Sequence, residues 1–494
     1  MLKVLVTGAL YNLLNVIVQI LLGLIVFREM LLHFGEADFG TWSLLFAILA
    51  HVKLFEFGLG SIVSKLVPVL RNGDSKNVSY FSTAIVVMAL IFTVFFFALV
   101  AVAVSVEHDS LKFEGTEAFT LVLLLIGCNF LFLYLTGVFH AYLTGSFQVG
   151  RLNSVRLFIN ILRSVLVIGS LQYDSSVVVV AFIFALTSLL ELLLLFLLSV
   201  KSGLLEDLDI SMCSMKSFAY VAERGCKLFF LSVNDYVRQN ALIIVSGFVL
   251  GVVAIVPLRI AGRLMEVYVQ ASISLNYLLT PYFSSISNEA SDSIISKFFI
   301  SIICATTLSA VIFFNIILVG DWFLITWLGE VPQFTSEVVK LVAVGFCVAT
   351  IQGPCVSFLI SNDKNKTLMI LCLLEIITLL AIIYPLVEYF GVLGAGYAMT
   401  ISLVFSRGLF QPFIMSKVIK VRLHYYYANL LIPVLITGTA LSSLYWLSSK
   451  IDVADKNINV AIFVLMQGGL ALVVLYCLKQ KYGTKSSSVL RKGS

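Results

Sequence analysis

Long apolar runs separated by short polar stretches recur from one end of the chain to the other. Each holds about 20 residues with few charges, the length that a helix needs to cross the hydrocarbon core of a bilayer. In the first half they begin near Thr7, Phe39, Val78, Glu117, Leu152 and Ser175. After the polar stretch 201–216 they begin near Val221, Gly251, Phe298, Glu337, Leu368, Val392, Tyr426 and Asn459. The pattern predicts an all-α integral membrane protein with about 14 transmembrane helices.

The two halves resemble each other at a shift of about 215 residues, which is typical of a duplicated helical bundle. A short polar turn, 144–153, joins the fourth and fifth runs, and another, 361–367, joins the tenth and eleventh. Because each half holds an even number of helices, both halves run in the same direction, and a central cleft between them is expected. The predicted organisation is a six-helix lobe, a cytoplasmic inter-lobe loop, a second six-helix lobe, and two additional helices with a basic tail, over 1–200, 201–217, 218–422 and 423–494 respectively.

The basic residues predict the orientation, because Lys and Arg prefer the cytoplasmic side of a membrane. One set of alternate connections, together with both tails, holds 21 of them. The opposite set holds only Arg28, Lys112, Lys340, Lys450 and Lys456. We therefore expect a multi-pass protein with both termini in the cytoplasm.

The amino-acid composition and charge exclude several classes of protein function. Of the 494 residues, 60% are hydrophobic and 12% are charged, against about 25% charged in a soluble domain. This excludes a soluble enzyme, and a dispersed net charge of +5 argues against a nucleic-acid partner. The eight cysteines form no CxxC or Cys/His cluster, so no metal site is expected. Without a phosphate-binding loop or an HExxH motif, we expect no cofactor and no catalytic residues.

Six basic residues fall inside predicted spans: Lys53, Arg163, Arg238, Arg259, Arg263 and Arg407. Each costs about 2.5–3.5 kcal/mol at the bilayer centre, so each must face a polar cavity or a partner. Arg259 and Arg263 stand one helical turn apart, on one face with Glu266 and Gln270. Two mutually repelling guanidinium groups followed by one acid favour a multivalent anion as ligand, since guanidinium matches phosphate bidentately.

The other intramembrane polar residues leave alternatives open. Lys53 with Glu56, and Asp235 with Arg238, are spaced as packing ion pairs and equally as functional groups. Glu191 and Glu375 favour packing roles. Arg163 and Arg407 have no acid within one turn of their own helix. Amide side chains form a stripe on the first span that fits helix–helix hydrogen bonding or the lining of a cavity, at Asn12, Asn15 and Gln19.

Two segments resemble bacterial polysaccharide repeat-unit flippases (the Wzx type) of the MOP/MATE-like superfamily. The stretch FGTWSLLF from Phe39, running into LFEFGLG from Leu54, is similar to the second span of that family, with Glu56 where Asp is frequent. The stretch from Leu250 to Arg263 is similar to the eighth span, although Pro257 and Arg259 replace its usual apolar and aromatic residues. The resemblance covers nearly the whole chain in length, span number and repeat.

This resemblance implies two pseudo-symmetric six-helix lobes plus two extra helices around a V-shaped cavity. The implied activity is alternating-access translocation of undecaprenyl-diphosphate-linked oligosaccharide repeat units across the bacterial inner membrane, for O-antigen, capsule or exopolysaccharide synthesis. Implied partners are that lipid-linked glycan, membrane lipid, H⁺ or Na⁺ as a coupling ion, and a polysaccharide polymerase with its chain-length regulator.

Residue roles follow as hypotheses. The cations that would hold the diphosphate or acidic sugars are Arg259, Arg263, Arg238, Lys53, Arg407 and Arg163. The coupling candidates are Asp235, Glu56 and Glu266, and the polar cavity lining would be Asn12, Asn15, Gln19 and Gln270. Three rivals remain: a multidrug exporter of the same superfamily, a lipid II flippase, and a membrane polysaccharide polymerase. The exporter would favour an acidic cavity, and the polymerase would need a large outer loop that the pattern lacks.

Overall fold

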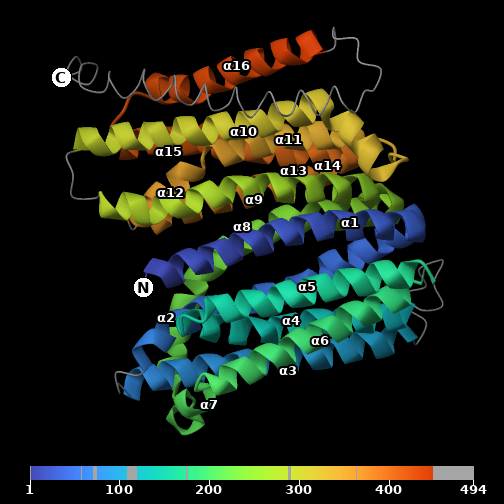
Figure 1. The fold of residues 1–494 in the computed structure, drawn as a ribbon, viewed down its shortest axis with the longest axis vertical. Coiled ribbons are helices and arrows are strands. Elements are labelled where there is room, and N and C mark those ends of the chain that lie inside the picture. Colours follow the sequence, from blue (N-terminus) through green and yellow to red (C-terminus); the bar gives the residue numbers. More distant parts are fainter. Residues whose placement is uncertain are drawn as a thin grey trace. The chain divides into compact units, whose positions relative to one another are not determined.

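The computed structural model is all-helical, with short turns, across the residues it describes, which are 2–56, 58–70, 75–107, 119–173, 176–286, 291–362 and 364–448. The chain divides into two compact units, Met1–Ile244 and Val245–Ser494. The division falls inside α8 (Met215–Leu250), later along the chain than the predicted boundary at 201–217, which stays a prediction. Figure 1 gives the order of the helices in each unit.

The first unit is built on a packed set of long helices. Its elements before α8 are α1 (Leu2–Leu49), η1 (Ala50–Glu56), α2 (Leu59–Leu70), α3 (Ser75–Glu107), α4 (Phe119–Gly145), α5 (Val149–Leu171), α6 (Val177–Lys201), α7 (Leu204–Asp207) and η2 (Ile210–Met212). Helix α4 packs most extensively on α6 and also on α2 and α3, while α5 packs on α1 and α6. The group α4, α5 and α6 can be followed side by side in Figure 1.

Helix α1 contains the first predicted span and the beginning of the second. Gly35 interrupts it with φ 73° and ψ 176°, a backbone conformation that L side chains rarely adopt. The rings of Phe27 and Phe39 lie 4.9 Å apart, although an unbroken helix would separate residues 12 positions apart by about 18 Å. The chain therefore turns back on itself at Gly35.

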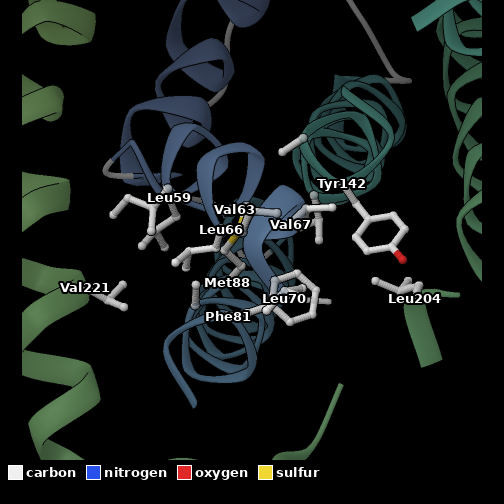
Figure 2. Packing of buried hydrophobic residues seen from close by; sticks show 14 of the residues in the cluster. Leu59, Val63, Leu66, Val67, Leu70, Phe81, Met88, Tyr142, Leu204 and Val221 are labelled. Carbon is white, nitrogen blue, oxygen red and sulfur yellow. The ribbon is translucent and has the colours of Figure 1, made fainter. Parts of the chain in front are cut away.

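The short segment that follows α6 is folded onto the first unit. Leu204 is buried in an apolar cluster with Leu70, Phe81 and Tyr142, and Figure 2 shows this packing. The Tyr142 hydroxyl also donates a hydrogen bond to Oδ2 of Asp207 at 2.7 Å. Apolar burial and this hydrogen bond together hold α7 against α4.

The second unit has matching elements. They are η3 (Val252–Ala254), α9 (Ile255–Ser285), α10 (Ser291–Leu328), α11 (Thr335–Ile351), α12 (Gly353–Ser361), α13 (Asn365–Phe390), α14 (Val392–Leu403), η4 (Val404–Phe410), α15 (Gln411–Val418) and α16 (Leu423–Ser448). Helix α11 packs on α9, α10 and α14, while α16 packs on α10. Two helices are irregular: the run α11–α12 is interrupted at Gln352, just before Gly353 and Pro354, and η4 is a π-helical stretch.

The elements of the two units stand at a constant spacing along the chain. The pairs α3 and α10, α4 and α11, and α5 and α13 have the same spacing between their first residues, which are Ser75 and Ser291, Phe119 and Thr335, and Val149 and Asn365. Gly35 has a counterpart at this same spacing, Gly251, with φ 91° and ψ 171°. The units are therefore structural repeats, in agreement with the shift of about 215 residues expected from the pattern.

Ten helices among the described residues are long and apolar enough to cross a membrane, and one of these segments, Val16–Leu70, covers part of the first predicted span and all of the second. The chain is a multi-pass membrane protein. The count of about 14 spans stays a prediction, and the last expected span, which begins near Asn459, lies outside the described residues.

Candidate functional site

The two arginines predicted to face an anion lie on α9, one turn apart. Nη1 of Arg263 forms an ion pair with Oε2 of Glu266 at 2.6 Å, one turn further along the same helix. Nε of Arg263 is buried and has no hydrogen-bond partner among the described residues. The ion pair thus uses part of the donor capacity of Arg263.

Arg259 is half-buried on the same helix. It makes no ion pair or hydrogen bond with any residue in the part of the chain that the structure describes. Glu266 is therefore shared electrostatically by two guanidinium groups, and this segment of α9 carries a net positive charge. Gln270, further along the helix, is exposed.

Several other predicted site residues lie in the first unit. Arg238 is half-buried on α8, and it has an interaction partner. Lys53 belongs to η1 and Asp235 to α8, but their side chains lie outside the described residues, as do those of Asn12 and Asn15.

Glu56 stands where the second span is broken. The break between η1 and α2 contains Gly58 at φ 69°, and Oε1 of Glu56 accepts the backbone N–H of Gly60 at 3.1 Å. A carboxylate is favoured at the positive end of a helix, so Glu56 stabilises the start of α2. A Cβ atom at Gly60 would lie 2.2 Å from this oxygen, so glycine leaves room for the carboxylate.

Arg163 on α5 is bound to α6. Its Nε donates to Oγ1 of Thr187 at 2.8 Å, and one terminal nitrogen donates to Oγ of Ser188 at 3.0 Å. The same nitrogen lies 4.0 Å from Glu191, which also faces Arg156 at 3.8 Å. Sequence reasoning did not find this cluster, because it searched for acids only along the same helix and counted Arg156 among the loop cations.

Arg407 is buried in the second unit and bound to a carboxylate. Its Nε donates to Oε2 of Glu375 on α13 at 2.8 Å, and Nη1 donates to Oε1 of Gln411 at 3.3 Å. Gln411 in turn donates to the backbone carbonyl of Gln352 at 3.3 Å, and Tyr426 donates to the Gln352 side chain at 2.9 Å. This network connects the π-helical stretch to the break in α11–α12.

The predicted polar residues thus fall into different groups. Arg407 and Arg163 lie in hydrogen-bonded clusters inside their own units, while Arg259 and Arg263 share one carboxylate on α9. Gln19 is exposed on α1. No group of three or more His, Cys, Asp or Glu side chains among the described residues could hold a metal ion. A cation-rich helix with spare donors can bind an anion, and α9 fits this chemistry best.

No protein-family model and no curated protein matches this chain, but solved structures share its fold. The lipid II flippase MurJ in an inward closed conformation is 14% identical, with a TM-score of 0.69, and the match covers 96% of this chain and 99% of that one. An inward-facing multidrug resistance MATE family transporter of the MOP superfamily is also 14% identical, with a TM-score of 0.67 over 81% of this chain and 95% of that one.

A third similar structure is a MOP superfamily transporter from Pyrococcus furiosus, for which reverse polarity of the binding pocket suggests a different function. It is 14% identical, with a TM-score of 0.60 over 85% of this chain and 97% of that one. The present chain therefore has a MATE- and MurJ-like fold, and the MATE-like fold agrees with what the resemblance of its sequence implied.

Proposed function

We propose that this protein translocates an undecaprenyl-diphosphate-linked oligosaccharide across the bacterial inner membrane, with Arg259 and Arg263 binding the diphosphate. The observation that carries the proposal is that two guanidinium groups on one apolar helix share a single carboxylate, that of Glu266. Keeping Arg259 without an ion partner among the described residues costs free energy. A substrate with two adjacent phosphates would repay this cost by forming charge-assisted hydrogen bonds.

The chemistry of such a substrate agrees with the fold. A diphosphate carrying a polar glycan cannot enter about 30 Å of hydrocarbon unaided, and multi-pass bundles of this fold belong to transporters. Asp235, Glu56 and Glu266 remain candidates for coupling to H⁺ or Na⁺. Of these, Glu266 is in direct contact with a substrate-binding candidate, so binding of an anion would compete with it for Arg263.

The first test replaces both arginines by glutamine, which retains polarity and removes charge. Purified protein is reconstituted into liposomes, and the translocation of a fluorescent undecaprenyl-diphosphate-linked sugar is measured. We expect Arg259→Gln/Arg263→Gln to lower the rate at least tenfold, because each charged hydrogen bond contributes about 1.5–3 kcal/mol. Arg422→Gln, at a cation between α15 and α16, is the matched control and should leave the rate near that of the wild type.

An unchanged rate in the double variant, at an equal amount of folded protein in the liposomes, would remove both arginines from substrate binding. A wild-type protein that fails to move the labelled lipid would refute the proposed substrate itself.

A lipid II flippase is the second candidate, because the MurJ match covers 96% of this chain, more than the other two matches described above. Lipid II presents the same lipid diphosphate, so the arginine variants cannot separate the two. Competition between lipid II and a lipid-linked oligosaccharide in the same liposome assay separates them by the glycan that is preferred.

A further inference from the structure

We infer that Arg156 forms, with Arg163 and His140, a second phosphate-binding site that lies within the first unit. The site is distinct from the arginines of α9, and it does not depend on the substrate proposed above. It lies where α4, α5 and α6 pack together. The ligand is the phosphate group of a lipid, either a phospholipid headgroup or the diphosphate of a lipid-linked sugar.

Both arginines of the site share Glu191. Nε of Arg156 lies 3.8 Å from one carboxylate oxygen of Glu191, and a terminal nitrogen of Arg163 lies 4.0 Å from the other. Arg156 and Arg163 are seven residues apart on α5, so they project from the same face of that helix. Two positive groups therefore converge on one buried negative group.

Arg163 and Arg156 differ in how many of their N–H donors already form hydrogen bonds. Arg163 donates to Thr187 and Ser188, and its guanidinium lies 5.2 Å from the Phe184 ring. Arg156 has one contact within hydrogen-bond distance among the described residues, between Nη1 and Nε2 of His140 at 3.2 Å. Its side chain is 44% exposed. Since guanidinium has five N–H donors, most of those on Arg156 are available to a ligand.

The second unit provides an internal comparison, because its elements repeat those of the first at a constant spacing. The counterpart of Glu191 is Arg407, and the counterpart of Arg156 is the neutral Cys372. There one arginine faces one carboxylate, that of Glu375, and both are buried. In the second unit the repeated helices thus pack around one arginine and one carboxylate, whose charges cancel. The packing of these helices therefore does not require a second arginine such as Arg156 in the first unit.

The position of Arg156 along its helix selects the ligand. It lies seven residues after Val149, the first residue of α5, which corresponds to about 10 Å along the helix axis. A residue at this depth lies within the hydrocarbon core, but a long arginine side chain that starts there can reach toward the lipid phosphates at the nearer membrane surface. Guanidinium binds phosphate bidentately, and this match favours phosphate over a carboxylate or a neutral headgroup.

Native mass spectrometry of the full-length protein in detergent tests the site. Dissociation constants are measured for two probes separately, phosphatidylglycerol and undecaprenyl diphosphate. We expect Arg156→Gln to weaken the binding of at least one probe about tenfold, and Arg156→Lys to weaken it less. Glu191→Gln should strengthen the binding of the same probe, because it removes the carboxylate that competes with the probe for the guanidinium group of Arg156. The control is Arg151→Gln, since Arg151 is an exposed cation of the same helix that donates to Gln148.

Each outcome decides the proposal. Weakening with undecaprenyl diphosphate alone assigns the site to the transported lipid, and weakening with phosphatidylglycerol alone assigns it to a phospholipid headgroup. Equal constants for Arg156→Gln and Arg151→Gln with both probes, in proteins with wild-type thermal stability, overturn the site. If the wild type binds no undecaprenyl diphosphate, the proposed function fails, whereas the phosphatidylglycerol measurements still decide this inference.

Discussion

Glu375 is only 2% exposed, and its carboxylate meets the guanidinium of Arg407 at 2.8 Å. The contact joins α13 to the π-helical stretch Val404–Phe410, where the regular hydrogen bonding of a helix is altered. Gln411 and Gln352 extend the network to the interruption of α11–α12. At the scale of single residues, Arg407 is therefore placed to hold two irregular helices together, which favours a structural role over direct contact with substrate.

Replacing Glu375 by Gln tests this role. The variant leaves the Arg407 charge buried without its counter-charge, so we expect the free energy of unfolding to fall by about 3 kcal/mol. The thermal unfolding midpoint of the purified protein in one detergent should drop clearly. Glu388→Gln removes an exposed carboxylate from the same helix and should leave the midpoint unchanged. Equal midpoints for the two variants would show that the pair does not stabilise the fold.

At the scale of elements, close backbone approach decides where helices can pack. Gly394 on α14 makes a very close contact of this kind, because a Cβ atom there would lie 1.8 Å from the carbonyl oxygen of Leu386 on α13. A backbone atom cannot move aside as the end of a side chain can. The α13–α14 pair therefore depends on glycine at this position.

We expect Gly394→Ala to destabilise the protein by about 1–3 kcal/mol, the range found for overpacked cores. Gly169→Ala on α5 is the matched control, since no atom lies within 4 Å of the added Cβ. Because alanine favours a helix over glycine by about 0.5–1 kcal/mol, the control should be neutral or stabilising. Thermal unfolding and the yield of monodisperse protein measure both effects, and a loss in both variants alike would contradict the packing argument.

The sequence predicts where helices begin better than it predicts which side chains of different helices pair with one another. Hydropathy places the third span near Val78 and the twelfth near Val392, and the helices begin at Ser75 and Val392. The break before α2 and the π-helical stretch were missed, because neither changes the apolar pattern. The pairing of Arg407 with Glu375 was also missed, since ion pairs between helices depend on which faces meet. The constant repeat does not reveal this pair either, because it aligns Arg407 with Glu191 and Glu375 with Ile159.

At the scale of the whole molecule, the repeat separates shared scaffold from specialised chemistry. Helices recur at matching positions in the two units, but the charges on them do not. The counterparts of Arg259 and Arg263 in the first unit are Ser43 and Ala47, so the cations of α9 belong to one unit only. A duplicated bundle whose charges have diverged is consistent with a substrate that has one charged end.

The basic residues, 21 on one side against five on the other, predict the orientation of this molecule in the membrane, and cysteine labelling tests it. Tyr173 between α5 and α6 is 94% exposed, and Met215 at the start of α8 is 82% exposed. We expect a membrane-impermeant maleimide to label Tyr173→Cys in intact spheroplasts, and Met215→Cys only after permeabilisation. The wild type, with its eight cysteines, measures the background. If only Met215→Cys were labelled in intact spheroplasts, the orientation of the protein in the membrane would be opposite to the predicted one. The Arg156 site would then lie in the outer leaflet.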